Sequence, residues 1–221
     1  MKQLPIYACI ALAACSKPAP EQQDPEPAPP RPIATLKDDG RPVIVTFGDS
    51  LSAGHGAPSG QSYPDYLQHE LDKRKLGFRV ANEALSGDTT SGGVERIPLA
   101  LAHKPAIVVL ELGGNDGLRG LPVAVTRVNL EQMITAFQGA HAKILLAGIT
   151  LPRNYGDDYI RDFEKVYTDL AVKYKLPFLP FLLEGVAMQP GLMQEDGIHP
   201  TAAGNEKVAA TVYNALRPLL Q

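Results

Sequence analysis

The chain has 221 residues, of which 44% are hydrophobic and 20% charged, a balance that suits one α/β domain with a full core and excludes wholesale disorder. Its formal net charge of -3 gives no excess of Lys and Arg for a phosphate backbone, so we expect no nucleic-acid partner. The only two cysteines, Cys9 and Cys15, precede the domain, which therefore has no thiol for a disulfide or a metal cluster.

Residues 1–14 have the layout of a short secretory signal peptide. A basic residue precedes an apolar run that is too short to span a bilayer, and small residues follow. The tetrapeptide Leu12-Ala13-Ala14-Cys15 resembles the lipobox of bacterial lipoproteins, which implies a lipid anchor on Cys15. With Ser16 next, the resemblance implies attachment to the bacterial cell envelope, at the outer membrane. The alternative is an ordinary signal peptide with a chance cysteine.

Residues 15–40 are predicted to form a proline-rich tether. The stretch SKPAPEQQDPEPAPPRP has almost nothing to bury, so we expect an extended and partly stiff segment. It fits a spacer between a membrane and a folded domain at residues 41–221, although a disordered leader without a function would have the same composition.

Within the domain, short β-branched or aliphatic runs alternate with amphipathic stretches, which is the pattern of βα units around a parallel sheet. Buried strands are expected at residues 43–47, 78–81, 106–112, 143–149 and 176–179. Helical spacing of apolar residues marks 64–75, 121–138, 158–174 and 201–216. The economical fold is a three-layer α/β/α sandwich with a five-stranded parallel sheet. In such sheets the ligand lies beyond the carboxyl ends of the strands.

The first expected strand runs into Gly48-Asp49-Ser50-Leu51, which places Ser50 on a glycine-flanked turn. There the hydroxyl of Ser50 could face a cleft and act as a nucleophile. A turn or a helix N-cap is the commoner use of such residues and remains the alternative.

Two later turns offer hydrogen-bond donors suited to an oxyanion. Gly87, in SGDT after the second strand, lets a backbone N–H approach a ligand without obstruction by a Cβ. Asn115, in GGND after the third strand, has an amide that can donate to a developing negative charge. Each also has a plain alternative, a turn before a helix cap at Gly87 and an Asn-Asp-Gly turn at Asn115.

Asp196 and His199 lie just before the last expected helix, where the carboxylate can fold back onto the imidazole through Gly197. Asp196 would then set the tautomer of His199 and stabilise the imidazolium that forms when His199 takes a proton from Ser50. A metal is the alternative for an Asp-x-x-His pair, but no second cluster completes a three-ligand site, and we expect neither a metal nor a cofactor. His55, near Ser50 in sequence, could touch the substrate.

Taken together, GDSLSAG, SGDT, GGND and DGIHP resemble the four blocks of the SGNH, or GDSL, hydrolases, in the same order. The stretches ELGGNDGLRG and LPRNYG resemble the bacterial branch that contains arylesterases and thioesterase I/lysophospholipase L1. This resemblance implies a five-stranded parallel sheet between helices. It also implies that Ser50 is the nucleophile, His199 the base and Asp196 its orienting acid, with an oxyanion hole formed by Ser50 N–H, Gly87 N–H and the Asn115 side chain.

We therefore expect a serine esterase for short- to medium-chain acyl or aryl esters, with lysophospholipase or acyl-thioesterase activity as extensions. An O-acetylesterase acting on envelope polysaccharide is an alternative, as is a non-catalytic lipid-binding surface protein. The expected partners are a small acyl-ester or lysolipid substrate and a membrane, with no obligate protein partner. The loops at 118–122 and 151–156 are either substrate walls or plain connections.

Overall fold

The computed structural model describes residues 39–221. The predicted signal peptide at 1–14, the lipid anchor on Cys15 and nearly all of the predicted tether at 15–40 lie outside the described residues, so these interpretations stay predictions.

The described part of the chain contains a five-stranded sheet with the order β2-β1-β3-β4-β5, in which every neighbouring pair is parallel. The strands are β1 (Val43–Gly48), β2 (Arg79–Ala84), β3 (Ile107–Glu111), β4 (Lys143–Ala147) and β5 (Phe178–Leu179). The predicted fold class and the number of strands are confirmed.

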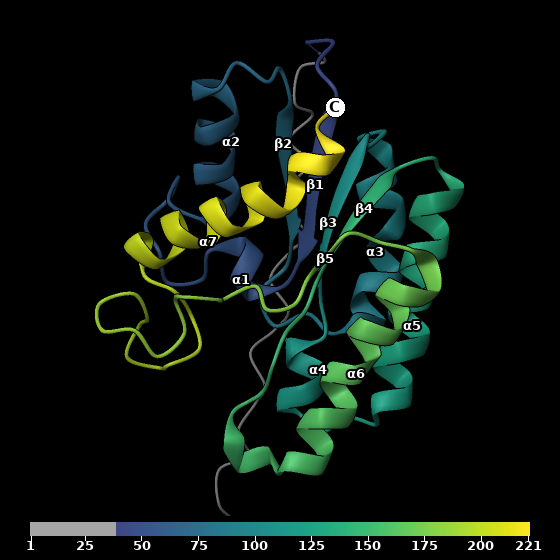
Figure 1. Ribbon diagram of the computed structural model, residues 1–221, viewed down its shortest axis with the longest axis vertical. Helices are drawn as coiled ribbons and strands as arrows, with labels where there is room; N and C mark the ends of the chain where they lie inside the picture. The colour runs from purple at the N-terminus through teal and green to yellow at the C-terminus, as the bar shows by residue number, and fades with distance from the viewer. Residues whose placement is uncertain (1–38) are drawn as a thin grey trace, which may run out of the picture. The chain divides into compact units, whose positions relative to one another are not determined.

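Helices cover both faces of this sheet (Figure 1). The helices are α1 (Ser50–Ala53), α2 (Tyr63–Lys73), α3 (Thr90–Ala102), α4 (Gly114–Leu118), α5 (Val123–Gly139), α6 (Asp157–Tyr174) and α7 (Ala202–Leu216). α2 and α7 pack on one face, and α3, α5 and α6 pack on the other. No helix in residues 39–221 combines the length and the apolar character needed to cross a bilayer.

Alternate side chains of the central strands enter opposite cores. Val45 and Phe47 of β1 pack in the core with α3, α5 and α6, whereas Ile44 packs in the core with α2 and α7. Because both faces are covered, the central strands are continuous apolar runs rather than alternating ones. Burying each such side chain stabilises the fold by about 1.5–3 kcal/mol.

Two of the differences from the sequence expectations are at β2 and α3. β2 runs on to Ala84, because its backbone pairs with β1 as far as Gly48. Hydrophobic periodicity gives no bounds for α3, because two glycines and Pro98 weaken its helical pattern. Tertiary packing explains one of these glycines: a Cβ on Gly93 would come 2.5 Å from Cδ1 of Leu112.

Candidate active site

Ser50 is the first residue of the short helix α1, directly beyond the carboxyl end of β1. The helix N-cap that the sequence left open is present here: Asp49 is the N-cap of α1, and its side chain accepts a hydrogen bond from Leu51 N at 3.0 Å. Gly48 must be a glycine, because a Cβ there would overlap the side chains of Ser52 and Glu111. This close approach holds the first residue of α1 at the edge of the sheet.

His199 lies next to Ser50, although 149 positions separate them in the sequence. Nε2 of His199 is 2.9 Å from Oγ of Ser50, and Nδ1 is 2.7 Å from Oδ2 of Asp196. The other oxygen of Asp196 accepts hydrogen bonds from the backbone N–H groups of Ile198 and His199, at 2.9 and 3.0 Å. The positive φ of Gly197, 68°, turns the chain so that the carboxylate faces the imidazole.

The charge state of Asp196 follows from these contacts. Partial burial works to raise the pKa of Asp196, but the hydrogen bonds from His199 and Ile198 outweigh it and lower the pKa to about 2. An ionised carboxylate only accepts hydrogen bonds, so Nδ1 of His199 must be the donor. In the neutral imidazole with this tautomer, Nε2 accepts the hydrogen bond of the Ser50 hydroxyl.

Gly87 and Asn115 line the same cavity as Ser50. At Gly87 the backbone φ is 80°, while an added Cβ would meet nothing within 4 Å, so conformation rather than space favours glycine there. Nδ2 of Asn115 donates to the carbonyl oxygen of Asp88 at 2.9 Å and to Oδ2 of Asp49 at 3.2 Å. Both amide hydrogens are thus engaged, and an oxyanion would have to share or replace the longer bond to Asp49.

Asp49 and Glu111 form a buried acidic pair that sequence reasoning missed. Glu111, the last residue of β3, is fully buried and accepts a hydrogen bond from Oγ of Ser52 at 2.6 Å, while Ser52 also contacts the hydroxyl of Tyr63 at 2.9 Å. The backbone N–H of Asp49 points to the same Glu111 oxygen, at 3.4 Å. The polar GDS and ELGGND stretches were the available signals, but nothing local shows that the two carboxyl groups meet.

Burial determines the protonation of this pair. Burial raises the pKa of Asp49 to about 6, against the lowering effect of the Leu51 hydrogen bond. Burial also raises the pKa of Glu111 well above its usual range, and the nearby charge of Asp49 adds to this rise. Oε1 of Glu111 has no hydrogen-bond partner among the described residues, which further favours the neutral acid. Burial thus favours the protonated form of both acids.

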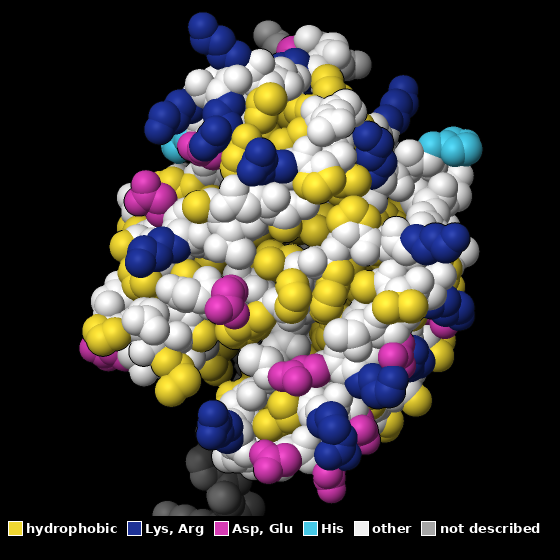
Figure 2. Space-filling view, viewed as in Figure 1, with side chains coloured by type: hydrophobic (Ala, Val, Ile, Leu, Met, Phe, Trp, Pro, Cys, Tyr) yellow, Lys and Arg dark blue, Asp and Glu magenta, His cyan; other side chains and the backbone are white. Residues whose placement is uncertain are grey.

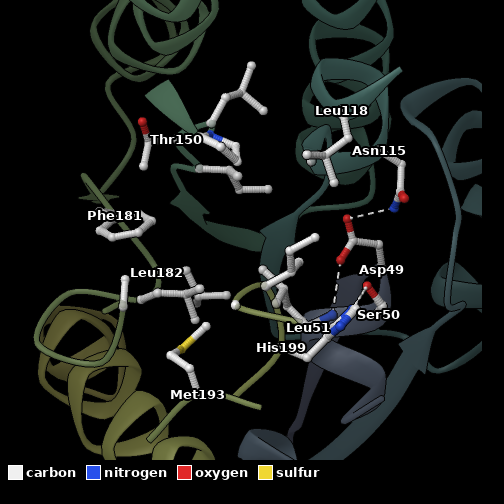
Figure 3. A pocket seen from close by; sticks show the side chains of 18 of the residues that line it. Asp49, Ser50, Leu51, Asn115, Leu118, Thr150, Phe181, Leu182, Met193 and His199 are labelled. Atoms are coloured by element: carbon white, nitrogen blue, oxygen red, sulfur yellow. Dashed lines mark hydrogen bonds between the residues drawn. The ribbon is translucent and has the colours of Figure 1, made fainter. Parts of the chain in front are cut away.

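A cavity of about 990 Å³ opens beside Ser50 and His199, and its walls are largely apolar (Figure 3). Of the predicted walls, Leu118 and residues 151–153 line this cavity, whereas the remaining positions of those two loops do not. A further wall was missed by sequence reasoning and comes from the segment after β5, which contributes Phe181, Leu182 and Met193. Hydrophobic side chains gather across the middle of the face seen in Figure 2, with charged side chains spread around them.

His55 also lines this cavity, as the sequence suggested it could. Its ring lies against that of His199, with the two centroids 4.6 Å apart and the planes inclined by 46°. Among residues 39–221, no group of three or more His, Cys, Asp or Glu side chains is placed to hold a metal ion.

Residues 46–207 match the GDSL-like Lipase/Acylhydrolase family. The chain belongs to this family. The family predicted from the four sequence blocks is thereby confirmed, and this GDSL hydrolase is an enzyme of the serine carboxylic ester hydrolase class.

Relatives of this GDSL hydrolase include several named enzymes. The chain is 45% identical over 179 residues to the esterase TesA of Pseudomonas aeruginosa. This alignment covers 80% of this chain and 89% of the relative. It is 38% identical over 189 residues to thioesterase 1/protease 1/lysophospholipase L1 of Escherichia coli, covering 85% and 89%. A crystal structure of TesA superposes with a TM-score of 0.77 at 44% identity, over 80% of this chain and 99% of the other.

Proposed function

We propose that this GDSL hydrolase is a serine esterase in which Ser50, His199 and Asp196 form the catalytic triad. The observation that carries the proposal is the continuous contact from Asp196 Oδ2 through the His199 ring to Ser50 Oγ, with steps of 2.7 and 2.9 Å. Both distances are within hydrogen-bond reach, which a nucleophile and its base require.

In the first half of the reaction, Oγ of Ser50 attacks the acyl carbon while Nε2 of His199 takes its proton. Asp196 stays ionised and stabilises the imidazolium that results. The carbonyl oxygen, now negative, is received by the backbone N–H groups of Ser50 and Gly87 and by Nδ2 of Asn115. His199 then returns the proton to the departing alcohol or thiol, which leaves an acyl-Ser50 ester. Water activated by His199 hydrolyses this ester in the second half of the reaction.

The substrate class follows from the cavity. Its volume of about 990 Å³ lies at the upper end of the range for small-molecule sites, and its mostly apolar walls suit an acyl chain or an aryl group. We propose short- to medium-chain acyl or aryl esters as substrates, with lysophospholipids and acyl thioesters as further candidates. An acetyl group would leave most of this apolar space unfilled, so the cavity does not favour O-acetylated polysaccharide.

The proposal is tested with p-nitrophenyl esters of increasing acyl length and with a fluorophosphonate that labels activated serines. We expect hydrolysis and stoichiometric labelling in the parent protein and the loss of both in Ser50→Ala. Ser59→Ala, which removes an exposed hydroxyl in the nearby loop, serves as the matched control and should keep full activity. Labelling at another serine, or hydrolysis that survives in Ser50→Ala, would refute the assignment.

We further propose that the enzyme is attached to the bacterial envelope through Cys15. The support is the sequence Leu12-Ala13-Ala14-Cys15 followed by a proline-rich stretch. Full-length protein expressed in a bacterium should fractionate with membranes, and Cys15→Ala should shift it to the soluble fraction. Membrane fractionation that persists in Cys15→Ala would overturn the proposal, while Cys9→Ala provides the matched control.

A further inference from the structure

The loop that carries Asp196 and His199 is joined to the Ser50 segment by a side chain that plays no part in the triad. Nε2 of Gln194 donates one hydrogen bond to the carbonyl oxygen of His55 at 2.7 Å and another to that of Pro200 at 2.9 Å. The backbone N–H of Gln194 donates to the carbonyl oxygen of His199 at 2.8 Å. Gln194 therefore contacts both sides of the gap that the Ser50–His199 pair bridges.

The other end of this connection is anchored to helix α1. The backbone N–H of His55 donates to the carbonyl oxygen of Ser50 at 3.0 Å, so the position of His55 follows that of the nucleophile. Gly56 has a φ of 72° and approaches the Gln194 carboxamide so closely that an added Cβ would overlap its oxygen. The carboxamide is therefore packed against the backbone of residues 55–56 as well as hydrogen-bonded to it.

Few other contacts connect the Ser50 segment to the loop that carries Asp196 and His199. Among the hydrogen bonds of residues 39–221, only two join residues 50–56 to residues 191–200: that of Gln194 with His55 and that of His199 with Ser50. The ring of His55 adds a packing contact, since it lies 4.6 Å from the ring of His199. Asp196 restrains the same imidazole through Nδ1.

We propose that Gln194 is a positioning residue for the esterase reaction. Its hydrogen bonds to the carbonyl oxygens of His55 and Pro200 keep the His199 ring at hydrogen-bond distance from Ser50 Oγ. The His55 ring packs against the His199 ring and limits its movement. This inference rests on the proposed triad. A carboxamide is required because both bonds are donated to carbonyl oxygens, and a carboxylate at the same position would only repel them.

The test uses Gln194→Met in the full-length chain, which keeps the length of the side chain and removes both donors. A displacement of about 1 Å in a catalytic pair costs up to about 100-fold in rate. We expect kcat for p-nitrophenyl butyrate and the rate of Ser50 labelling by a fluorophosphonate to fall about 10- to 100-fold, with KM changed by less than about twofold. Gln194→Glu should be at least as impaired.

A matched control separates positioning from general destabilisation. Asn205→Ala removes another amide-to-carbonyl bond between distant segments, from Asn205 to Gln61 at 3.0 Å, and neither residue is hydrogen-bonded to Ser50, Asp196 or His199. Assayed well below its unfolding temperature, this control should keep the parent kcat even if it unfolds at a lower temperature. If it loses kcat in parallel with Gln194→Met at equal loss of stability, the positioning role is refuted.

A double-mutant cycle tests the route through His55. If Gln194 acts partly by holding His55 against His199, Gln194→Met should cost less in a His55→Ala background than in the parent. Additive losses would overturn this route. A parent protein labelled at Ser50 together with an unimpaired Gln194→Met would overturn the inference while leaving the proposed function intact, whereas a parent protein that is not labelled at Ser50 would overturn the proposed function itself.

Discussion

Asn115 donates a hydrogen bond from Nδ2 to Oδ2 of Asp49, 3.2 Å away. Asp49 is itself buried and held by Leu51 N, so the residue that precedes the proposed nucleophile helps to orient the proposed oxyanion donor, together with the shorter bond from Asn115 to the carbonyl oxygen of Asp88. One short segment, Asp49-Ser50, thus both presents the hydroxyl and aims an amide that lies after a different strand. This coupling between β1 and β3 motivates the first two predictions.

Asn115→Ala is expected to lower kcat by about 100- to 1,000-fold, because removing one oxyanion donor typically costs that much in an acyl-transfer enzyme. KM should change little, since the amide does not form the apolar walls of the cavity. Steady-state kinetics with p-nitrophenyl butyrate provides the measurement. Asn129→Ala, which removes an amide bonded to Thr90 and Ser91 instead, is the control and should retain kcat.

The buried pair makes stability depend on pH in a defined direction. Because the pKa of Asp49 is raised to about 6 from an ordinary value of 3.8, the folded state binds its proton more tightly than the unfolded state. This contribution is fully present below pH 3.8 and is lost as the pH rises through about 6. The loss is on the order of 2–3 kcal/mol. The raised pKa of Glu111 contributes in the same direction.

Urea unfolding at intervals between pH 4 and pH 7 measures this dependence. The free energy of unfolding of Asp49→Asn, compared with that of the parent, should fall less steeply over this range, because one of the two buried acids is gone. Parallel curves for the two proteins would show that Asp49 carries no raised pKa. Asp65→Asn, which alters an acid in the capping box of α2, controls for a general change in charge.

The contribution of Asp196 to stability depends on pH in the opposite direction. Its pKa is lowered to about 2, so the stability it contributes is present above pH 3.8 and is lost as the pH falls through about 2. Asp196 therefore remains ionised throughout any practical assay. Acid unfolding between pH 5 and pH 2 should narrow the difference in stability between the parent and Asp196→Asn.

Asp196→Asn should also lower kcat strongly. An asparagine would favour the wrong tautomer of His199 and would no longer stabilise the imidazolium, and the equivalent change in the Ser-His-Asp proteases costs about 10⁴-fold. We expect a loss of about 10³- to 10⁴-fold in kcat at pH 7. A loss smaller than about tenfold would show that Asp196 does not orient the base. Asp158→Asn, which alters an exposed acid on α6, provides the control.

The size of the cavity should control acyl-chain preference. Leu118→Trp adds bulk to one wall, and filling a hydrophobic pocket discriminates between substrates by about 10-fold or more for each displaced methylene group. The ratio of kcat/KM for decanoate over butyrate p-nitrophenyl esters should fall by at least about tenfold. Val128→Trp, placed on the exposed surface of α5, should leave this ratio unchanged. An unchanged ratio in Leu118→Trp would place the acyl chain elsewhere.

The parallel sheet was predictable because its signal is local. A strand buried on both faces is a run of apolar residues, and such runs are visible in the sequence at β1, β3 and β4 without knowledge of any neighbour. The bounds of β2 were less predictable, because Asn82 and Glu83 are polar and belong to the strand only through their pairing with β1. Helix α3 was obscured in part by Gly93, which allows a close contact with Leu112 of another segment.

The sequence by itself determined the family, the parallel sheet and the residues Ser50, Gly87, Asn115, Asp196 and His199 as candidates, because each lies in a short block whose residue types suit one chemistry. Only the tertiary structure decided that Asp49 meets Glu111, that Gln194 meets His55, and that the segment after β5 walls the cavity. These pairs and walls join segments far apart in the chain, and they come together only when the carboxyl ends of the strands converge at one edge of the sheet. Nothing in the local sequence encodes such distances or the burial that shifts the pKa of Asp49.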